Sequence, residues 1–360
     1  YILGLDVECI GSANVEVYVQ KGGEKTATVS WEKIDGTDAN FAKIKFDATV
    51  RNGKLCIRCE SPDKAITVNF FGLFGNSASA RIIITLPVDI DEFKYKGSTS
   101  KLFLDDAGFK IRVDLQTDVG DITVRSPLNT QNLSIKGDVG NIVFNAPGTA
   151  SQTFAIKSDV GAITTQSITA ETVHITSDVG AIKVDQITGL QRVSIKSDVG
   201  SITVAHINTP SLTVKSDVGS IKLPNATVTE IGEIKSDVGS IAGSFASFKN
   251  FNVSTDVGSI NVTLAPAADA ATKIESDVGK VTAVVTGFNG IFKGKSDMGK
   301  VSLRGTGSDL DGENRGTVSC MIGAAGGKGA FAVKTDTSRI EVTFVPSSLP
   351  DYAEKVEKEQ

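Results

Sequence analysis

Apolar and polar residues alternate along most of this chain, and the alternation returns at a fixed interval. One interval, 171–184, reads E-T-V-H-I-T-S-D-V-G-A-I-K-V. Its apolar positions on either side of Gly180 are Val173, Ile175, Val179, Ile182 and Val184. A period of two residues is typical of β-strands that bury one face, whereas a helix needs a period near 3.6. The pattern therefore predicts short β-strands and excludes helix in this part of the chain.

A short motif, Asp-Val-Gly with Met in place of Val in the last copy, marks each interval. Asp118 begins the first copy and Asp297 the last, so nine intervals span 179 residues and average about 20. The aspartates are Asp118, Asp138, Asp159, Asp178, Asp198, Asp217, Asp237, Asp256, Asp277 and Asp297. The glycines are Gly120, Gly140, Gly161, Gly180, Gly200, Gly219, Gly239, Gly258, Gly279 and Gly299. Degenerate copies at 98–102 and 336–340 extend the array, and the whole indicates a repeat architecture.

Each repeat has room for two or three short strands and a corner, which predicts an all-β, parallel β-solenoid (β-helix). Equivalent strands of successive coils would stack about 4.8 Å apart and bury a continuous face of Ile, Val and Leu. Between 98 and 340 the repeat gives about twelve coils of about 20 residues. One coil buries too little apolar surface to offset the ordering of its backbone, so we expect both ends of the array to be covered.

The limits of the repeat divide the chain into four parts. Residues 1–95 lack the motif but contain short alternating stretches separated by glycine-containing turns, and we expect a β-rich N-terminal capping region there. Residues 96–303 form the regular S-D-V-G solenoid. We expect interrupted final coils and a C-terminal cap over 304–345, followed by a polar tail at 346–360.

The corner residues have structural roles in this account. Straight alternation through S-I-K-S-D-V-G places Ser197 and Val199 inward and Asp198 outward. Glycine follows because a corner with positive φ penalises a Cβ atom. The aspartate is expected to accept hydrogen bonds from backbone N–H groups just past the corner, as in an Asx-turn. The twenty Asp and Gly residues of the motif are thus expected to form a structural turn ladder.

Charge and composition exclude several functions. The chain has 37 Lys and Arg against 42 Asp and Glu, a net charge of −5 that is spread along its length. Because no basic stripe gathers phosphate charge, we expect no nucleic-acid partner. The longest apolar runs are far shorter than the ~20 residues that span a bilayer, so no transmembrane segment is expected.

The aspartate ladder is not expected to bind metal, and no cofactor is expected. A lysine stands two residues before many of the aspartates, at Lys136, Lys157, Lys196, Lys215, Lys235, Lys295 and Lys334. These lysines offset the repulsion between stacked carboxylates, whereas calcium would need six to eight oxygen ligands. His174 and His206 have no evident catalytic partner, and the short intervals leave no room for catalytic loops. The sequence therefore predicts no enzyme activity.

Four cysteines are too few to build a disulfide scaffold in a chain of this size. Cys56 and Cys59 resemble a C-x-x-C motif, but they lie in a predicted strand, where residues three apart point to opposite faces. A zinc or redox role for that pair is therefore not expected. A bridge from Cys9 to Cys56 or Cys59, and buried free thiols, both remain open, and Cys320 stands far from the others in sequence.

Four N-x-Ser/Thr sequences give possible glycosylation sites at Asn132, Asn225, Asn252 and Asn261. Asn132, Asn252 and Asn261 alternate to the outer face of the predicted strands, where a glycan would fit.

Several segments resemble a known family. They are R-I-I-I-T-L-P-V-D-I-D-E-F-K-Y-K-G-S-T-S-K-L-F-L at 81–104, the repeated S-D-V-G-x-I, and the closing V-K-T-D-T-S-R-I-E-V. Together they resemble the putative-adhesin β-strand-repeat family, a domain of unknown function that is common in bacterial envelope proteins. In that family the corner is usually Gly-Asp or Gly-Asn before Ile, and here only Asp121 and Asn141 match. The resemblance covers about 80–345 and implies a solenoid at or outside the cell surface; it offers no catalytic residues to carry over.

These observations predict a non-enzymatic, cell-surface or extracellular β-solenoid that acts as an adhesin-like or structural spacer module. A surface polysaccharide or a protein is the expected type of ligand. Self-association into a filament is the main alternative, and a β-helix enzyme acting on polysaccharide is a distant one.

Overall fold

The computed structural model describes residues 3–23, 26–36, 38–61, 79–86, 89–105, 108–305, 312–323 and 326–346. It divides into two compact units, 1–200 and 201–360. The described residues form β-strands and turns, apart from one helical turn, α1 (Asp38–Phe41). Within these ranges no helix has the length and apolar character needed to cross a membrane. The expected polar tail lies outside the described residues beyond Pro346.

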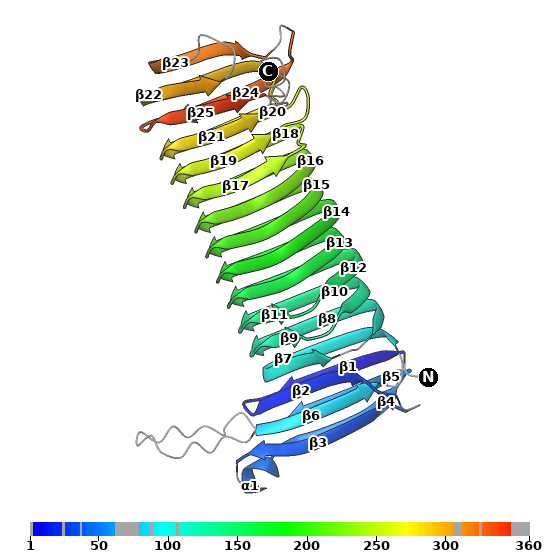
Figure 1. The fold of residues 1–360 in the computed structure, drawn as a ribbon. Helices are drawn as coiled ribbons and strands as arrows, with labels where there is room; N and C mark the ends of the chain where they lie inside the picture. Colours follow the sequence, from blue (N-terminus) through cyan, green and yellow to red (C-terminus); the bar gives the residue numbers. More distant parts are fainter. Residues whose placement is uncertain are drawn as a thin grey trace, which may run out of the picture. The chain divides into compact units, whose positions relative to one another are not determined.

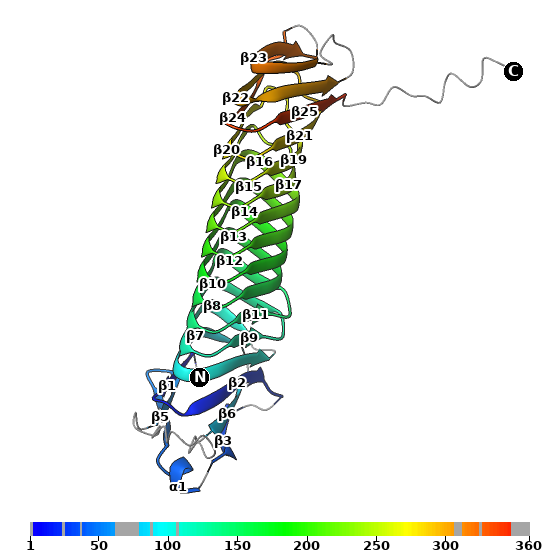
Figure 2. The ribbon, with the colours of Figure 1, turned by 90° about the vertical axis from the view of Figure 1, so that its left-hand side faces the viewer.

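The described residues of the first unit form fourteen strands. They are β1 (Gly4–Ile10), β2 (Asn14–Lys21), β3 (Thr28–Asp35), β4 (Lys45–Arg51), β5 (Lys54–Glu60), β6 (Ser79–Leu86), β7 (Ile90–Asp105), β8 (Phe109–Val119), β9 (Ile122–Val124), β10 (Leu128–Val139), β11 (Ile142–Phe144), β12 (Gly148–Val160), β13 (Ile163–Val179) and β14 (Ile182–Val199). β8, β10, β12, β13 and β14 pair in parallel in that order, as Figure 1 shows. β9 and β11 belong to another side of the same coils (Figure 2).

Register within these coils follows the apolar period of the sequence. Ile135, Ile156 and Ile175 are successive Cα partners, and all three are buried. Side chains of the same type therefore stack on one another in the interior, which removes apolar surface from water in every coil at once. The expected all-β class with solenoid-like parallel strands is confirmed.

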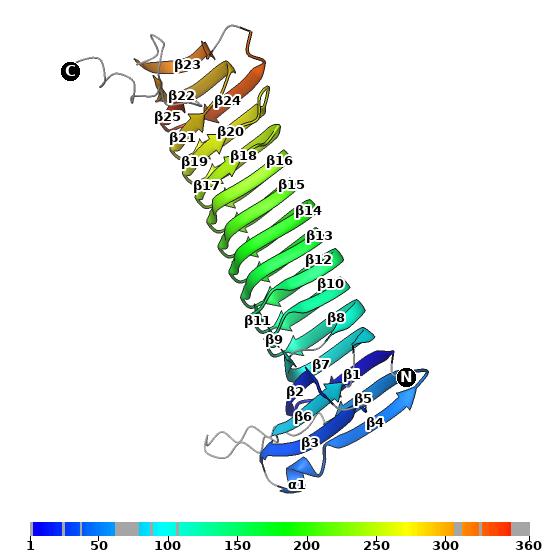
Figure 3. The same ribbon diagram turned by 45° about the vertical axis from the view of Figure 1, so that its right-hand side comes forward.

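The N-terminal strands do not stack in chain order. β1 lies between β5 and β7, and β2 lies between β6 and β7, all in parallel (Figure 3). β4 and β3 then pair antiparallel with β5 and β6. Trp31 of β3 stacks on Phe41 and Phe46, with ring centroids 5.2 and 5.1 Å apart. The antiparallel strands and this aromatic cluster cover the parallel edge that β5 and β6 would otherwise present.

Eleven strands are formed by the part of the second unit that the structure describes. They are β15 (Ile202–Val218), β16 (Ile221–Val238), β17 (Ile241–Ala246), β18 (Asn250–Val257), β19 (Ile260–Ala265), β20 (Ala271–Val278), β21 (Val281–Thr286), β22 (Gly290–Gly305), β23 (Gly312–Ile322), β24 (Gly329–Thr335) and β25 (Ile340–Val345). β15 pairs with β16, and the coils continue through β18 and β19 to β20 and β21 with the same parallel register.

The last coil in the sequence is not the last coil in the stack. β24 pairs in parallel with β20 on one side and β22 on the other, and β25 lies in the same way between β21 and β22. Figure 1 shows the red strands between the yellow and orange ones. Sequence order had placed 331–345 after the coil of Asp297; the chain instead leaves β22 through the antiparallel strand β23 and returns beneath it. Phe331 of β24 thereby packs against Phe292 and Phe344 inside the unit.

Candidate binding groove and turn ladder

The ten turns of the motif lie at the outer surface of their units, with each aspartate half-buried or exposed. The valine that follows nine of these aspartates also points outward, so the expected inward position of Val179 and Val199 is wrong. The outward valines are Val119, Val139, Val160, Val179, Val199, Val218, Val238, Val257 and Val278, each 47–50 % exposed. Strand pairing omits the aspartate, passing from the Ser177–Ser197 pair directly to the Val179–Val199 pair. The backbone therefore turns at Asp-Val, one residue earlier than straight alternation assumes.

Each motif glycine lies against the backbone of the neighbouring coil. A Cβ atom on Gly180 would stand 2.1 Å from the carbonyl oxygen of Gly161, and its φ is +152°. At Gly279 the distance to the Gly258 oxygen is 1.8 Å. The close approach thus excludes a side chain in both turns, whereas the positive φ expected from the sequence is a second cause that applies at Gly180.

In several turns a hydroxyl group hydrogen-bonds the turn backbone, the role that the sequence predicts for the aspartate beside it. The residue before each aspartate is mostly a buried Ser or Thr. Ser276 Oγ donates to the carbonyl oxygen of Gly258 at 3.0 Å, and Thr255 Oγ1 donates to that of Gly239 at 3.0 Å. In the turn of Asp297, Ser296 Oγ donates to Ser338 O at 2.9 Å and accepts from Gly299 N at 2.8 Å. These bonds join the turn of one coil to the next.

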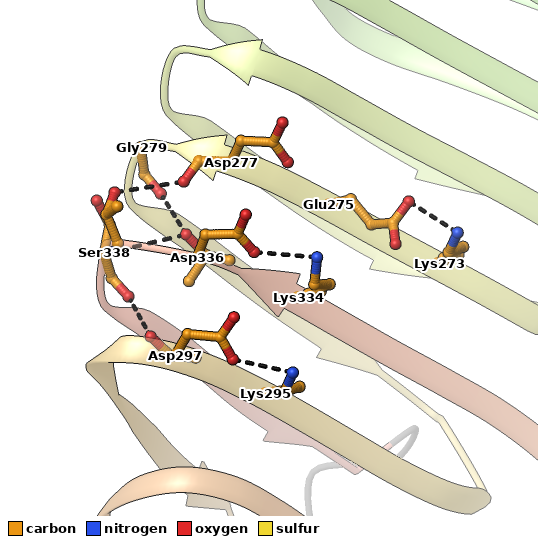
Figure 4. A network of polar contacts seen from close by, with 12 residues as sticks. Lys273, Glu275, Asp277, Gly279, Lys295, Asp297, Lys334, Asp336 and Ser338 are labelled. Carbon is orange, nitrogen blue, oxygen red and sulfur yellow. Dashed lines mark hydrogen bonds and ion pairs between the residues drawn. The ribbon is translucent and has the colours of Figure 1, made fainter.

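Five of the ten ladder carboxylates bind the lysine two residues earlier on their own strand, namely those of Asp138, Asp159, Asp198, Asp237 and Asp297, whereas Lys215 pairs with Glu233. Figure 4 shows two such pairs side by side, Lys295–Asp297 at 2.9 Å and Lys334–Asp336 at 3.0 Å. In the first unit Lys157 pairs with Asp159 at 2.7 Å, and this hydrogen bond lowers the pKa of Asp159 and raises the pKa of Lys157. Exposed pairs of this kind contribute little to stability, about 0–1 kcal/mol each. Their main effect is to neutralise the stacked carboxylates.

The structure places the other sequence candidates on the surface or apart from one another. His174, His206, Asn225, Asn252 and Asn261 are exposed. Asn132 is half-buried, and its amide donates to Gln152 Oε1 at 3.1 Å. Within the described ranges, no three His, Cys, Asp or Glu side chains cluster in a way that could hold a metal ion.

A groove of about 460 Å³ opens in the first unit at the beginning of β10. Its lining residues are Lys21, Asp89, Gly108, Phe109, Lys110, Pro127, Asn129, Thr130, Gln131 and Ser151. Lys21 Nζ binds Asp89 Oδ1 at 2.8 Å, so these two charges neutralise each other at one side. The remaining polar lining consists of one lysine, two carboxamides and two hydroxyls.

Thr130 differs from the other polar residues that line this groove because it is buried. It is 7 % exposed, and its buried Oγ1 has no hydrogen-bond partner. The register between β10 and β12 shifts between Thr130 and Asn132, which marks a local irregularity beside the groove. Thr130 alternates with the exposed Asn129 and Gln131, so its hydroxyl lies on the buried side of β10, away from their carboxamides. Sequence reasoning missed this site because its residues form no motif and come from five separate segments.

Comparisons with known proteins agree with the fold. The model of the Toastrack DUF4097 family matches residues 9–309. A putative adhesin from Bacteroides fragilis is 19 % identical, with a TM-score of 0.43 over 62 % of this chain and 92 % of that one. A putative cell adhesion protein from Clostridium sporogenes is 10 % identical, with a TM-score of 0.18 over 95 % of this chain and 92 % of that one. These two structural similarities are too low to carry an argument, and no curated protein matches the chain.

Proposed function

Because the chain belongs to the Toastrack family, we propose that it is a non-enzymatic, adhesin-like module of the cell surface that binds a polysaccharide in the groove beside β10. The stacked coils serve as the scaffold that carries the groove.

The observation that carries this proposal is the pair of exposed carboxamides, Asn129 and Gln131, that line the groove beside Lys110 and Ser151. Asn129 and Gln131 each present one acceptor and two donors, which match the hydroxyl groups of a sugar. Pro127 supplies an apolar wall against which the C–H face of a sugar ring can lie. A carbohydrate is therefore the ligand class that uses this lining best.

The lining does not favour glycoside cleavage. Such enzymes ordinarily place two carboxyl groups on opposite sides of the scissile bond. Asp89 is the one carboxylate among the lining residues, and Lys21 binds it. We therefore propose binding without turnover.

The outer strands weigh against the filament alternative. A filament would continue the parallel stacking from chain to chain. β3 and β4 instead run antiparallel to β6 and β5, and β23 runs antiparallel to β22. An antiparallel outer strand interrupts the parallel register that a second copy would have to extend.

The test is binding of the purified chain to an array of defined glycans. We expect the wild type to bind a subset of them, and the Asn129→Ala/Gln131→Ala variant to bind that subset at least ~10-fold more weakly, since it loses two hydrogen-bonding groups. The matched control is Gln186→Ala, an exposed carboxamide outside the groove, which should bind like the wild type. All three proteins should melt at the same temperature. Absence of any bound glycan, or equal binding by the double variant, would contradict the proposal.

A further inference from the structure

Two cysteines lie side by side in the interior of the first unit. Cys9 of β1 and Cys59 of β5 are Cα partners in a parallel pair. Their side chains are 3 % and 1 % exposed, and both are free thiols. The sequence left open whether Cys9 would pair with Cys56 or with Cys59. The register between β1 and β5 now distinguishes these two pairings.

The geometry suits a covalent bond between these two residues and disfavours Cys56. Adjacent strands lie about 4.8 Å apart, within the Cα separation of about 4.4–6.8 Å that disulfides span. Register partners on paired strands point to the same face of the sheet, and both of these side chains are buried there. Cys56 is the register partner of Asp6, points to the opposite face, and its Sγ lies 3.9 Å from Lys54 O.

The neighbours of the two cysteines on the adjacent strands are a phenylalanine and a glycine. On the β4 side Cys59 faces Phe46, and on the β7 side Cys9 faces Gly97, which has no side chain. The nearby Tyr95 hydroxyl donates to Ser100 Oγ at 2.5 Å and is fully buried. The pair therefore occupies an apolar pocket of the core without a metal-binding neighbour among the described residues.

We propose that Cys9 and Cys59 form an intrachain disulfide that ties β1 to β5 when the protein matures under oxidising conditions. The oxidant is a disulfide, either a small molecule such as oxidised glutathione or a dithiol–disulfide oxidoreductase. One cysteine thiolate attacks the oxidant and releases a thiol; the second cysteine then attacks the mixed disulfide and releases another. The chain gives up two electrons and two protons, and the oxidant leaves as two thiols. This inference is independent of the glycan groove.

The bond forms during folding rather than afterwards. The hydrogen bond from Cys59 and burial raise the pKa of Cys9 well above its usual range, so little thiolate exists in the folded unit. Oxidant also has no access to side chains this deeply buried. Once formed, the bond closes a loop that contains β2, β3 and β4 and holds the capping strands against the coil of β7.

The experiment refolds the full chain in a glutathione buffer rich in the oxidised form, and compares it with the chain refolded in dithiothreitol. We expect the four thiols of the sequence to fall to two when counted in denaturant. Non-reducing peptide mapping should join the peptides that contain Cys9 and Cys59. The oxidised protein should melt about 5–10 °C higher than the reduced one.

Matched variants identify the pair. Cys9→Ala and Cys59→Ala should lose the linked peptide and the rise in melting temperature. Cys56→Ala and Cys320→Ala remove half-buried cysteines elsewhere and should keep both. If the buried variants fail to fold, the wild-type peptide map and the Cys56→Ala/Cys320→Ala double variant still decide. Four free thiols after oxidation, or a link that contains Cys56 or Cys320, would overturn the proposal.

Discussion

A chain that ends at Lys328 is expected to lose the ordered structure of β22 as well as the missing β24 and β25. The truncation removes the coil that separates β20 and β21 from β22. The removed core side chains are Phe331, Val333, Ile340, Val342 and Phe344, all at most 7 % exposed. At about 2 kcal/mol each, their burial is comparable with the whole stability of a typical domain. Amide hydrogen exchange of 290–305 should therefore become fast.

The control is a chain that ends at Pro346. It keeps β24 and β25, and its exchange over 290–305 should match that of the full chain. If the coils stacked in chain order, β22 would pack directly on β20 and β21. It would then stay ordered in the chain that ends at Lys328. Slow exchange of 290–305 in the chain ending at Lys328 would therefore contradict the observed order of strands.

Replacement of Gly140 by Ala is expected to cost about 3 kcal/mol or more. The new Cβ would stand 2.2 Å from the carbonyl oxygen of Gly120 and 2.6 Å from its carbon, at a φ of +144°. Backbone atoms of a packed neighbouring coil cannot move aside without breaking pairs on both sides. The melting temperature of the first unit should fall by about 6–12 °C in a thermal scan.

Gly137 gives the matched control within the same turn. It is buried, but the nearest heavy atom to its Cβ position is 3.6 Å away, an ordinary contact. Its register partners are Thr117 and Ser158, whose hydroxyls donate to turn carbonyls at 3.5 and 3.3 Å. Gly137→Ser should therefore leave the stability unchanged or raise it by about 1 kcal/mol. An equal loss from the two substitutions would mean that glycine is required for chain flexibility and not for close approach.

The sequence was most informative about features that depend on the residues of a single coil. The period of two placed Val173, Ile175 and Ile182 inward, and they are buried. The outward Val179 was missed because alternation was continued through a corner that begins at the aspartate. Counting residues along a strand does not show where the backbone turns.

Features that depend on contacts between coils were harder to predict from the sequence. The requirement for Gly279 comes from the Gly258 oxygen of another coil, a contact that no local pattern reveals. Placement of 331–345 between two earlier coils depends on which edge is available when the chain returns, and the repeat spacing carries no sign of it. The groove beside β10 likewise joins five segments that share no motif.

The central claim is that parallel coils stack in register, in the order given by strand pairing and not by the sequence. Ion pairs between coils test it directly, because a carbodiimide joins only amines and carboxylates in contact. We expect mass spectrometry of the treated full chain to find Lys215–Glu233, Lys249–Glu230 and Lys280–Glu341 links, each pair being 2.7 Å apart. The last link requires β25 to lie beside β21. A Glu341 joined to Lys300 and never to Lys280 would contradict the account.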